Sequence, residues 1–424
     1  MKALVKNRSL KVLVIDEEIP YPPDAGKRIR TWNLLKRLAG RHEVHLLCYG
    51  RSSNAGGEAL RAAGITLHLV EPPEELAGNA LYLRLFANLF SVYPFSVTKH
   101  YSRRFQNAFD ELLRNADWDL VQCEWTPYAR FLESGAKAPT VIATHNVESQ
   151  IWKRRAEHSP SWIERLFFGL QAQKMVWFER RALRRAARVT AVTAEDAKSM
   201  REWGVQNVAL VPNGVDTDFY VSAKEVANEN EILSVASLDW FPNADALEYF
   251  AEEIFPLIRE GLPKAVFRIV GRRPPAALKE KLSQIAGIDF VGEVEDVRPY
   301  LARAAVVVVP LRIGGGSRLK ILEALAAGKA IVSTSIGAEG LELISGEHLY
   351  IADAPKDFAL RVVELAKSSE AQQKVGASGK NLVTQRYGWD GIASRLETTW
   401  FDALQKSEET HGVRAVHREV SEAL

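Results

Sequence analysis

Residues 305–324 read AVVVVPLRIGGGSRLKILEA, and this stretch decides the fold class. Its β-branched run ends at Pro310, three glycines follow, and the apolar spacing of a helix begins near Leu319. A buried strand, a glycine loop and a helix in this order form the unit from which parallel sheets are built. We therefore predict a strand over residues 305–310 whose carboxyl end leads into the amino end of a helix.

The same alternation of short apolar runs and longer amphipathic segments occurs in both halves of the chain. Strands are expected at residues 11–16, 43–47, 66–70, 119–123, 140–144, 189–192, 232–236, 266–270, 288–291, 305–310 and 330–334. Helices are expected to begin near Lys27, Ser102, Gln150, Glu195, Ala244, Pro275, Val297, Leu319, Lys356 and Ala371. This pattern predicts an α/β protein with two facing Rossmann-like domains, each built on a parallel sheet.

The boundary between the two domains is expected after the segment VPNGVD at residues 211–216, within the polar stretch 221–231. We assign residues 1–220 to an N-terminal domain and residues 221–388 to a C-terminal domain. Residues 389–424 are expected to form a helix that packs back toward the first domain, with a frayed polar tail from residue 407.

Composition excludes several classes of protein. The chain has 424 residues, 47% of them hydrophobic and 25% charged, with a formal net charge of +2, so neither a disordered chain nor a general nucleic-acid binder is expected. Cys48 and Cys123 lack any zinc-site spacing and suit a reducing compartment. Charges at Lys6, Arg8 and Lys11 interrupt a signal-type apolar region, and the apolar stretch 80–95 is too short to span a membrane. We expect a cytoplasmic protein.

The glycine loop predicts an anion site. Gly314, Gly315 and Gly316 allow close backbone approach at a helix amino end, where Arg318 and Lys320 add positive charge. Glu323, about one turn further, is placed to accept hydrogen bonds from a diol such as ribose. These residues indicate a cradle for a nucleoside diphosphate, and the alternative is a flexible loop on an ordinary surface helix.

Here the chain resembles a known family. The segment GGGSRLKILEALAAGKAIVSTSIGAEGL at residues 314–341 is similar to the donor-nucleotide motif of family 4 glycosyltransferases (group 1), which have the GT-B fold of two facing Rossmann-like domains. Residues 211–216, 291–310 and RVTAVTAEDAK at 188–198 agree with it, and the resemblance covers roughly residues 11 to 402. HNVE at residues 145–148 and DWFPN at 239–243 resemble a branch associated with exopolysaccharide synthesis.

The resemblance makes residues 1–220 the acceptor-side domain and residues 221–388 the nucleotide-sugar-binding domain, and it also implies roles for individual residues. Glu323 matches the second glutamate of the family's E-x7-E motif, a ribose contact, whereas Gly315 stands where the first glutamate would touch the donor sugar. Residues 237–243 also lack the family's usual arginine and lysine pair, so Arg318 and Lys320 are expected to meet the charge of the leaving diphosphate. The full expected set of donor and substrate contacts is Gly26, Arg30, Asn243, Gly271, Arg272, Val294, Gly314, Gly315, Gly316, Ser317 and Glu323.

Two segments of the first domain are expected to contribute as well. Gly26 and Arg30, together with Lys27, lie after the first strand, where the family's loop meets the donor phosphate and the acceptor. His145 follows the strand at 140–144, and the resemblance places it beside the donor sugar as a catalytic residue with Arg318 and Lys320. Glu124, at the end of the preceding strand, is a candidate acceptor base, or else the cap of a loop.

These features predict a retaining glycosyltransferase of hexosyltransferase type. It would move a sugar from a nucleotide diphosphate-sugar to a hydroxyl of a glycan or lipid-linked acceptor in polysaccharide or glycolipid synthesis. We find neither a metal-ligand spacing nor a nucleophile motif and expect no metal, no cofactor and no nucleic-acid partner. The alternatives are a GT-B-fold sugar-nucleotide epimerase and, because of Gly315, a catalytically silent binding protein. A dinucleotide oxidoreductase is disfavoured because no G-x-G-x-x-G follows the first strand of either half.

Residues 150–190 contain ten Lys and Arg against three Asp and Glu, with aromatic residues interleaved. Basic amphipathic helices of this composition lie on anionic membranes, and residues 80–105 offer further apolar side chains. We therefore expect residues 80–105 and 150–190 to contact an anionic membrane surface. The alternative is a core-facing aromatic stripe with a solvated basic face.

Overall fold

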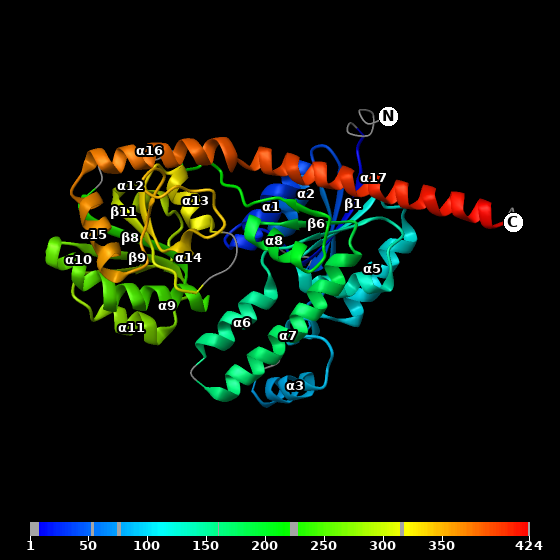
Figure 1. The fold of residues 1–424 in the computed structure, drawn as a ribbon, viewed down its shortest axis with the longest axis horizontal. Helices are drawn as coiled ribbons and strands as arrows, with labels where there is room; N and C mark the ends of the chain where they lie inside the picture. Colours follow the sequence, from blue (N-terminus) through cyan, green and yellow to red (C-terminus); the bar gives the residue numbers. More distant parts are fainter. Residues whose placement is uncertain are drawn as a thin grey trace. The chain divides into compact units, whose positions relative to one another are not determined.

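The computed structural model describes residues 8–51, 55–73, 78–159, 161–220, 228–313 and 318–422. The chain separates into two compact units (Figure 1), one formed by Met1–Pro212 with Ile392–Leu424 and the other by Asn213–Gly391. The division thus falls after Pro212, a few residues before the boundary that we placed at residue 220.

The first unit contains a seven-stranded parallel sheet in the order β3-β2-β1-β4-β5-β6-β7. Its strands are β1 (Lys11–Glu18), β2 (Glu43–Tyr49), β3 (Ile65–Val70), β4 (Leu120–Glu124), β5 (Thr140–Ala143), β6 (Arg188–Ala191) and β7 (Val208–Leu210). Six of them coincide with expected strands to within a few residues, because each is a short apolar run, and the central β1 and β4 are almost fully buried. We missed β7, since three residues are too few for a pattern.

Helices connect these strands. They are α1 (Gly26–Leu38), α2 (Ala55–Ala62), α3 (Asn79–Leu89), α4 (Phe95–His100), α5 (Arg103–Asn115), the 3₁₀ segment η2 (Thr126–Ser134), α6 (Glu148–His158), α7 (Trp162–Arg185) and α8 (Ala194–Glu202). Side chains of Thr193 and Ser102 cap α8 and α5 by accepting backbone N–H groups. The basic region 150–190 is therefore divided, with α6 and α7 packed as a hairpin (Figure 1).

The second unit contains a six-stranded parallel sheet in the order β10-β9-β8-β11-β12-β13. Its strands are β8 (Asn228–Ser237), β9 (Val266–Arg272), β10 (Ile288–Gly292), β11 (Ala304–Val309), β12 (Ala330–Ser333) and β13 (Tyr350–Ile351). Its helical segments are α9 (Phe241–Tyr249), the π-turn η3 (Phe250–Ile254), α10 (Phe255–Gly261), α11 (Ala276–Ser283), α12 (Arg298–Arg303), α13 (Leu319–Ala326), α14 (Ser335–Ala338), α15 (Pro355–Ala366) and α16 (Ser369–Arg386).

We expected the polar linker to continue to residue 231. This prediction is wrong, because β8 begins at Asn228. Glu231 is buried in this strand, and its carboxylate lies 3.2 Å from Arg268 and 3.3 Å from Arg303. Two guanidinium groups thus compensate the buried charge, which the local composition alone did not reveal.

The C-terminal helix α17 (Trp389–Glu422) begins in the second unit and continues in the first from Ile392. The fully buried Trp400 donates its indole N–H to Oε1 of Gln122 at 2.5 Å, and Glu397 lies 2.9 Å from Nε2 of His42. The expected α/β fold class, with two parallel-sheet domains and a helix that crosses back, is confirmed. The helix runs through the residues where we expected a frayed tail. Among the described helices, none is long and apolar enough to cross a membrane.

Candidate functional site

The carboxyl end of β11 in the second unit leads through the glycine loop to α13. Residues Gly314, Gly315, Gly316 and Ser317 lie outside the described part of the chain, so their expected contacts stay predictions. Arg318 follows them in the left-handed backbone region, with φ of 44°, and its buried guanidinium lies 2.9 Å from Oε2 of Glu339. A non-glycine residue held at positive φ is strained, and such strain is concentrated at functional sites.

Lys320 is the second residue of α13. Its ammonium donates to Oδ1 of the buried Asn243 at 2.6 Å, and the amide of Asn243 in turn donates to the carbonyl of Ser237 at 2.6 Å. Burial and the nearby charge of Arg318 together lower the pKa of Lys320 to about 7, against the attraction of Glu323. The expected contact residues Asn243 and Lys320 are thus brought together, in a place where, within the described part of the chain, the attraction of Glu323 only partly offsets the burial of a positive charge.

Glu323 lies one turn further along α13 and hydrogen-bonds the hydroxyl of Tyr220. Burial raises the pKa of Glu323, while Tyr220 and Lys320 act in the opposite direction. A carboxylate in this position accepts hydrogen bonds, which is what recognition of a ribose diol needs. Sequence reasoning missed Tyr220, because about a hundred residues separate it from its partner.

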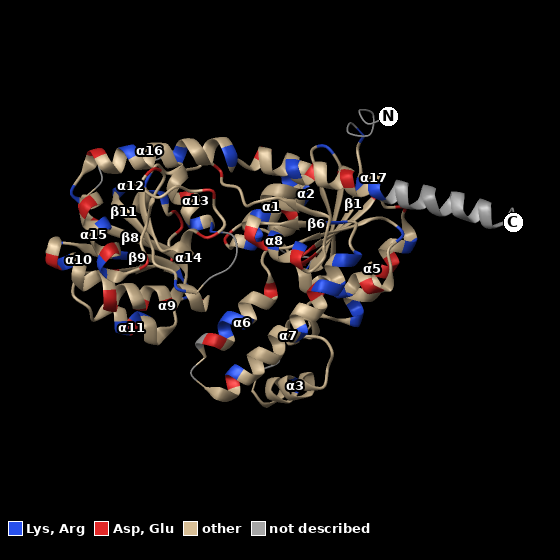
Figure 2. Cartoon of the chain, viewed as in Figure 1, with Lys and Arg blue, Asp and Glu red and all other residues tan. Residues whose placement is uncertain are grey.

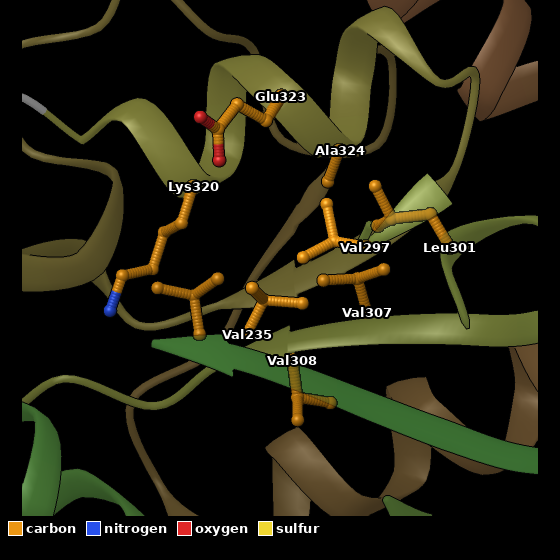
Figure 3. Close-up of a pocket in the computed structure, with 9 residues that line it drawn as sticks. Val235, Val297, Leu301, Val307, Val308, Lys320, Glu323 and Ala324 are labelled. Atoms are coloured by element: carbon orange, nitrogen blue, oxygen red, sulfur yellow. The ribbon is translucent and has the colours of Figure 1, made fainter. Parts of the chain in front are cut away.

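A small cavity of about 10 Å³ lies beneath this part of α13. Figure 3 shows the aliphatic side chains that enclose it, with Lys320 and Glu323 at one side and the ammonium of Lys320 directed away from the valines. This volume is close to the minimum for one water molecule. The apolar floor therefore explains why burial dominates the pKa of both charged residues.

Other expected donor contacts surround the ends of β8 and β9. Gly271 permits close packing of these strands, because a Cβ at this position would lie 2.4 Å from the carbonyl oxygen of Ala236. Arg272 donates from Nε to the hydroxyl of Ser237 at 2.9 Å, so Ser237 contacts both Arg272 and Asn243. Val294 is half-buried in the loop after β10.

In the first unit, β1 and the start of α1 form a compact charged cluster. Lys27 is the second residue of α1, and its ammonium lies 2.6 Å from Oδ1 of Asp16 and 3.1 Å from Oε2 of Glu17. Burial disfavours its charge, but these two carboxylates raise the pKa of Lys27 above its ordinary value. Gly26 is the first residue of α1. We expected the Lys27 ammonium to face a ligand, whereas internal carboxylates hold it.

Arg30 is fully buried one turn further along α1. Its guanidinium donates to the carbonyl oxygens of Pro212 and Val211 at 2.7 and 2.8 Å, which anchors the segment after β7. Burial lowers the pKa of Arg30 to about 10, and its positive charge acts on Glu124 and His145. Arg30 thus contributes to the electrostatics around His145, and its direct contact with a donor stays a prediction.

His145 follows β5 and meets Glu124 at the end of β4, with 3.1 Å between Nε2 and Oε2. Burial lowers the pKa of His145, which Glu124 opposes. Burial also disfavours ionisation of Glu124, but His145 and Arg30 hold its pKa below the ordinary value. The carboxylate receives a further hydrogen bond from the amide of Gln122 at 2.5 Å. This enclosed carboxylate is better placed to orient His145 than to accept a proton from an acceptor.

The segment after His145 is held by residues that sequence reasoning did not select. Glu179 of α7 accepts the backbone N–H groups of Glu148 and Ser149 at 2.8 and 3.2 Å, at the amino end of α6. Glu148 accepts the indole N–H of Trp125 at 2.8 Å. Trp125 follows β4 with φ of 91°, a strained conformation for a bulky residue. A second strained residue therefore marks a strand end that carries candidate site residues.

The structure assembles two groups of the expected site residues, one in each unit. Asn243, Arg318, Lys320 and Glu323 lie around the start of α13, and Arg272 is linked to them through Ser237. Glu124 and His145 lie at the ends of β4 and β5, and the charge of Arg30 on α1 acts on both. Within the described part of the chain, no group of three or more His, Cys, Asp and Glu residues is arranged to hold a metal ion. The first group offers positive charge to an anion, and the second holds a largely neutral histidine.

Comparison with known proteins agrees with this geometry. Residues 26–219 match the model described as Glycosyltransferase Family 4, and residues 229–368 match the model described as Glycosyl transferases group 1. The solved structure of Anabaena HepE in complex with UDP and glucose has a TM-score of 0.64 at 14% identity, over 92% of this chain and 99% of that one. At this identity the likeness shows the fold.

Curated relatives cover different shares of the chain. A phosphatidyl-myo-inositol mannosyltransferase of Mycobacterium tuberculosis is 28% identical over 222 residues, which are 46% of this chain and 55% of the relative. The chain thus spans about half the length of this relative. A 44.6 kDa protein of the Klebsiella pneumoniae cps region, itself uncharacterized, is 21% identical over 91% of this chain and 98% of its own.

The two parallel-sheet units and their structural neighbour define the class as proteins with the fold of GT-B glycosyltransferases. The family models, which together cover most of the chain, identify the family. The chain belongs to the group 1 glycosyltransferases of family 4.

Proposed function

We propose that this protein transfers a sugar, with retention of anomeric configuration, from a nucleotide diphosphate-sugar to a hydroxyl of a glycan or lipid-linked acceptor. The observation that carries the proposal is the Lys320 ammonium at the start of α13, half-buried and held by the neutral amide of Asn243. Burial disfavours the charge of such an ammonium, and a diphosphate bound beside it would stabilise that charge.

The second unit would bind the donor. Arg318 and Lys320 would bind the diphosphate and stabilise the charge that develops on it as the sugar bond breaks, without a metal ion. Glu323 would accept hydrogen bonds from the ribose, in exchange for the one it now receives from Tyr220. Backbone N–H groups of residues 314–317 would contact the sugar, and Arg272, Gly271 and Val294 would border the nucleotide.

The first unit would contribute His145 and the acceptor side. A buried, largely neutral imidazole whose Nε2–H faces Glu124 leaves Nδ1 as an acceptor, which suits contact with a sugar hydroxyl. Glu124 fixes the ring through Nε2, and Arg30 adds positive charge nearby. We propose His145 as a sugar-contacting residue and Glu124 as the residue that positions it. Gly26 would lie where the acceptor or donor phosphate approaches α1.

The relatives support a role in cell-envelope glycans. The mycobacterial relative is named for a phosphatidyl-myo-inositol acceptor, and the Klebsiella relative lies in a cps region. We propose polysaccharide or glycolipid synthesis, with a hexose as the transferred group. The HepE complex contains UDP and glucose, which makes UDP the first base to test.

One observation favours a different function. Gly315 replaces the glutamate that touches the donor sugar in the resembling family, so a chain that binds nucleotide-sugar without transfer is the second candidate. An epimerase would act on the nucleotide-sugar without any acceptor.

A panel of UDP- and GDP-sugars tests the proposal by release of free nucleotide, with and without lipid extract and in the presence of EDTA. Acceptor-dependent release that persists in EDTA supports transfer. Conversion of the sugar without acceptor would indicate an epimerase, and donor binding without turnover would indicate a silent binding protein. Anomeric configuration of the product, read by NMR, tests retention.

A further inference from the structure

Helix α3 presents its apolar side chains to solvent. Tyr82, Leu83, Phe86 and Phe90 follow the spacing of one helix face, and between 61% and 81% of each side chain is exposed. Globular proteins rarely leave several large apolar residues exposed together on one helix. This face therefore requires an explanation other than packing within the chain.

Polar contacts fix α3 in this orientation. The buried Asn88 donates to the carbonyl of Tyr93 and to Oγ1 of Thr98, both at 3.1 Å, and its amide oxygen accepts from Gln171 of α7 at 3.1 Å. Arg84 donates to the carbonyl of Thr98 at 2.7 Å. The helix thus directs its polar residues toward the protein and its apolar residues outward, the reverse of an ordinary surface helix.

The beginning of α7 continues the exposed apolar surface. Trp162, Ile163 and Leu166 share one helix face and are 73%, 61% and 68% exposed. Lys174 of the same helix donates to the backbone carbonyl of Asn88 at 2.7 Å, so α3 and α7 are linked. Figure 1 shows α3 and the α6–α7 hairpin extending on the same side of the first unit, away from its sheet. We call the seven exposed residues of α3 and α7 the apolar tip.

Positive charge accompanies the apolar tip. Residues 78–109 contain four Lys and Arg and no Asp or Glu, and α6 adds exposed Lys153 and Arg155, against exposed Glu157 on α6 and Glu164 on α7. The Arg155 guanidinium lies over the ring of Phe168, 4.4 Å from its centre. Figure 2 shows both basic and acidic segments on α6 and α7. Aromatic and aliphatic side chains next to a basic excess match the composition of surfaces that lie on anionic bilayers.

We propose that the apolar tip inserts into the interfacial region of an anionic lipid bilayer and holds the first unit on the membrane. Tyr, Trp and Phe side chains are suited to this depth, and the basic residues complement anionic head groups. A symmetric contact with a second copy would instead place like positive charges together, which disfavours a dimer through this surface. The proposal does not depend on sugar transfer and stands if that function fails.

Flotation of the purified chain with vesicles tests the proposal. We expect binding to phosphatidylcholine vesicles that contain phosphatidylglycerol, weaker binding to phosphatidylcholine alone, and partial loss at high salt. Replacing the tip residues Phe86→Ser, Phe90→Ser and Trp162→Ser together should reduce the partition coefficient by about tenfold or more, because large apolar areas leave the bilayer. Lys153→Ala with Arg155→Ala should reduce mainly the salt-sensitive part.

A matched control removes exposed apolar side chains elsewhere. Ile344→Ser with Leu360→Ser, from residues that are 56% and 52% exposed in the second unit, should leave flotation unchanged. Thermal unfolding establishes that the tip variant is folded. The proposal is overturned if anionic vesicles do not bind the chain, if the tip variant binds as well as the unmodified chain, or if sedimentation shows a dimer that the tip substitutions dissociate.

Discussion

Two half-buried lysines occupy similar places in the two units and have opposite electrostatics. Lys27 is the second residue of α1 after β1, and Lys320 is the second residue of α13 after β11. Two carboxylates contact Lys27 and raise its pKa, whereas a neutral amide contacts Lys320, whose pKa burial lowers to about 7. Two strand–helix junctions of the same kind thus differ: among the described residues, carboxylates contact the cation in one unit and a neutral amide contacts the cation in the other.

The difference indicates which junction awaits a ligand. A compensated ion pair stabilises the fold, and a desolvated cation lowers stability until an anion arrives. The position of a basic residue after a strand is therefore insufficient to assign an anion site. The charge of the groups that contact the basic residue decides whether an anion site can be assigned there.

Matched methionine substitutions give the largest expected contrast. Lys27→Met leaves the carboxylates of Asp16 and Glu17 without their partner and should lower the free energy of unfolding by about 3 kcal/mol or more. Lys320→Met removes an uncompensated charge and should leave that free energy equal or higher at pH 7. Chemical denaturation of both variants without nucleotide measures this contrast.

The pH dependence of unfolding has opposite signs for the two lysines. Because the folded-state pKa of Lys27 is raised, its contribution is full at neutral pH and is lost only as pH rises above about 10.4, the ordinary lysine value. The lowered pKa of Lys320 means that stability falls as pH decreases from about 10.4 toward about 7, and Lys320→Met should abolish this slope. Equal losses of stability in both variants would contradict the comparison.

The double variant Arg318→Ala, Lys320→Ala should reduce sugar transfer by about 10² to 10³, because both charges that stabilise the leaving diphosphate are removed. Initial rates with the active donor measure the effect. Arg312→Ala is the matched control: this arginine lies in the same loop and, like Arg318, is paired with a carboxylate, Asp245 at 2.6 Å, but the resemblance assigns it no donor contact. It should retain nearly full activity, and a loss of less than tenfold in the double variant would refute the leaving-group assignment.

Glu124→Gln removes the charge that orients His145 and should reduce transfer by roughly tenfold, with unchanged UDP affinity. If Glu124 acts only through His145, the double variant Glu124→Gln, His145→Ala should be no slower than His145→Ala alone. Rate constants and UDP affinities of the three variants form the cycle. Multiplicative losses would mean that Glu124 acts independently, and weakened UDP binding would mean a structural effect.

The architecture followed from the sequence because its strands are strongly apolar runs between helical patterns. The central β11, with four consecutive valines, was expected to within one residue at each end. The group at α13 also followed, since Arg318, Lys320 and Glu323 lie within six residues of one strand–loop–helix unit. Local order along the chain was sufficient in both cases.

What was not predicted depends on contacts between distant segments. Tyr220 and Glu339, the partners of Glu323 and Arg318, come from other loops of the second unit. The spacing of α3 indicates an apolar face but not its direction, which Asn88 and Gln171 fix from within. Likewise, Arg318 and Lys320 at the start of α13 look equivalent in the sequence. Only the burial of Lys320 in the structure shows that its pKa is lowered to about 7.

The smallest expected effect is the uptake of a proton when UDP binds. In the free protein Lys320 has a pKa of about 7, so at pH 7.5 a large share of it is neutral. A bound diphosphate raises the pKa of a nearby ammonium, so binding should draw up to about one proton from the buffer. Calorimetric titrations of UDP at pH 7.5, in buffers with different ionisation enthalpies, measure this number.

Lys320→Met should bind UDP more weakly and take up no proton, whereas Arg312→Ala should behave like the unmodified chain. Between pH 7 and 9 the affinity of the unmodified chain should fall as Lys320 loses its proton, because the neutral amine no longer attracts the diphosphate. Lys27 cannot produce this signal, since its carboxylate partners keep it charged throughout this range. Proton uptake that persists in Lys320→Met would therefore assign the titrating group elsewhere and remove the distinction drawn between the two lysines.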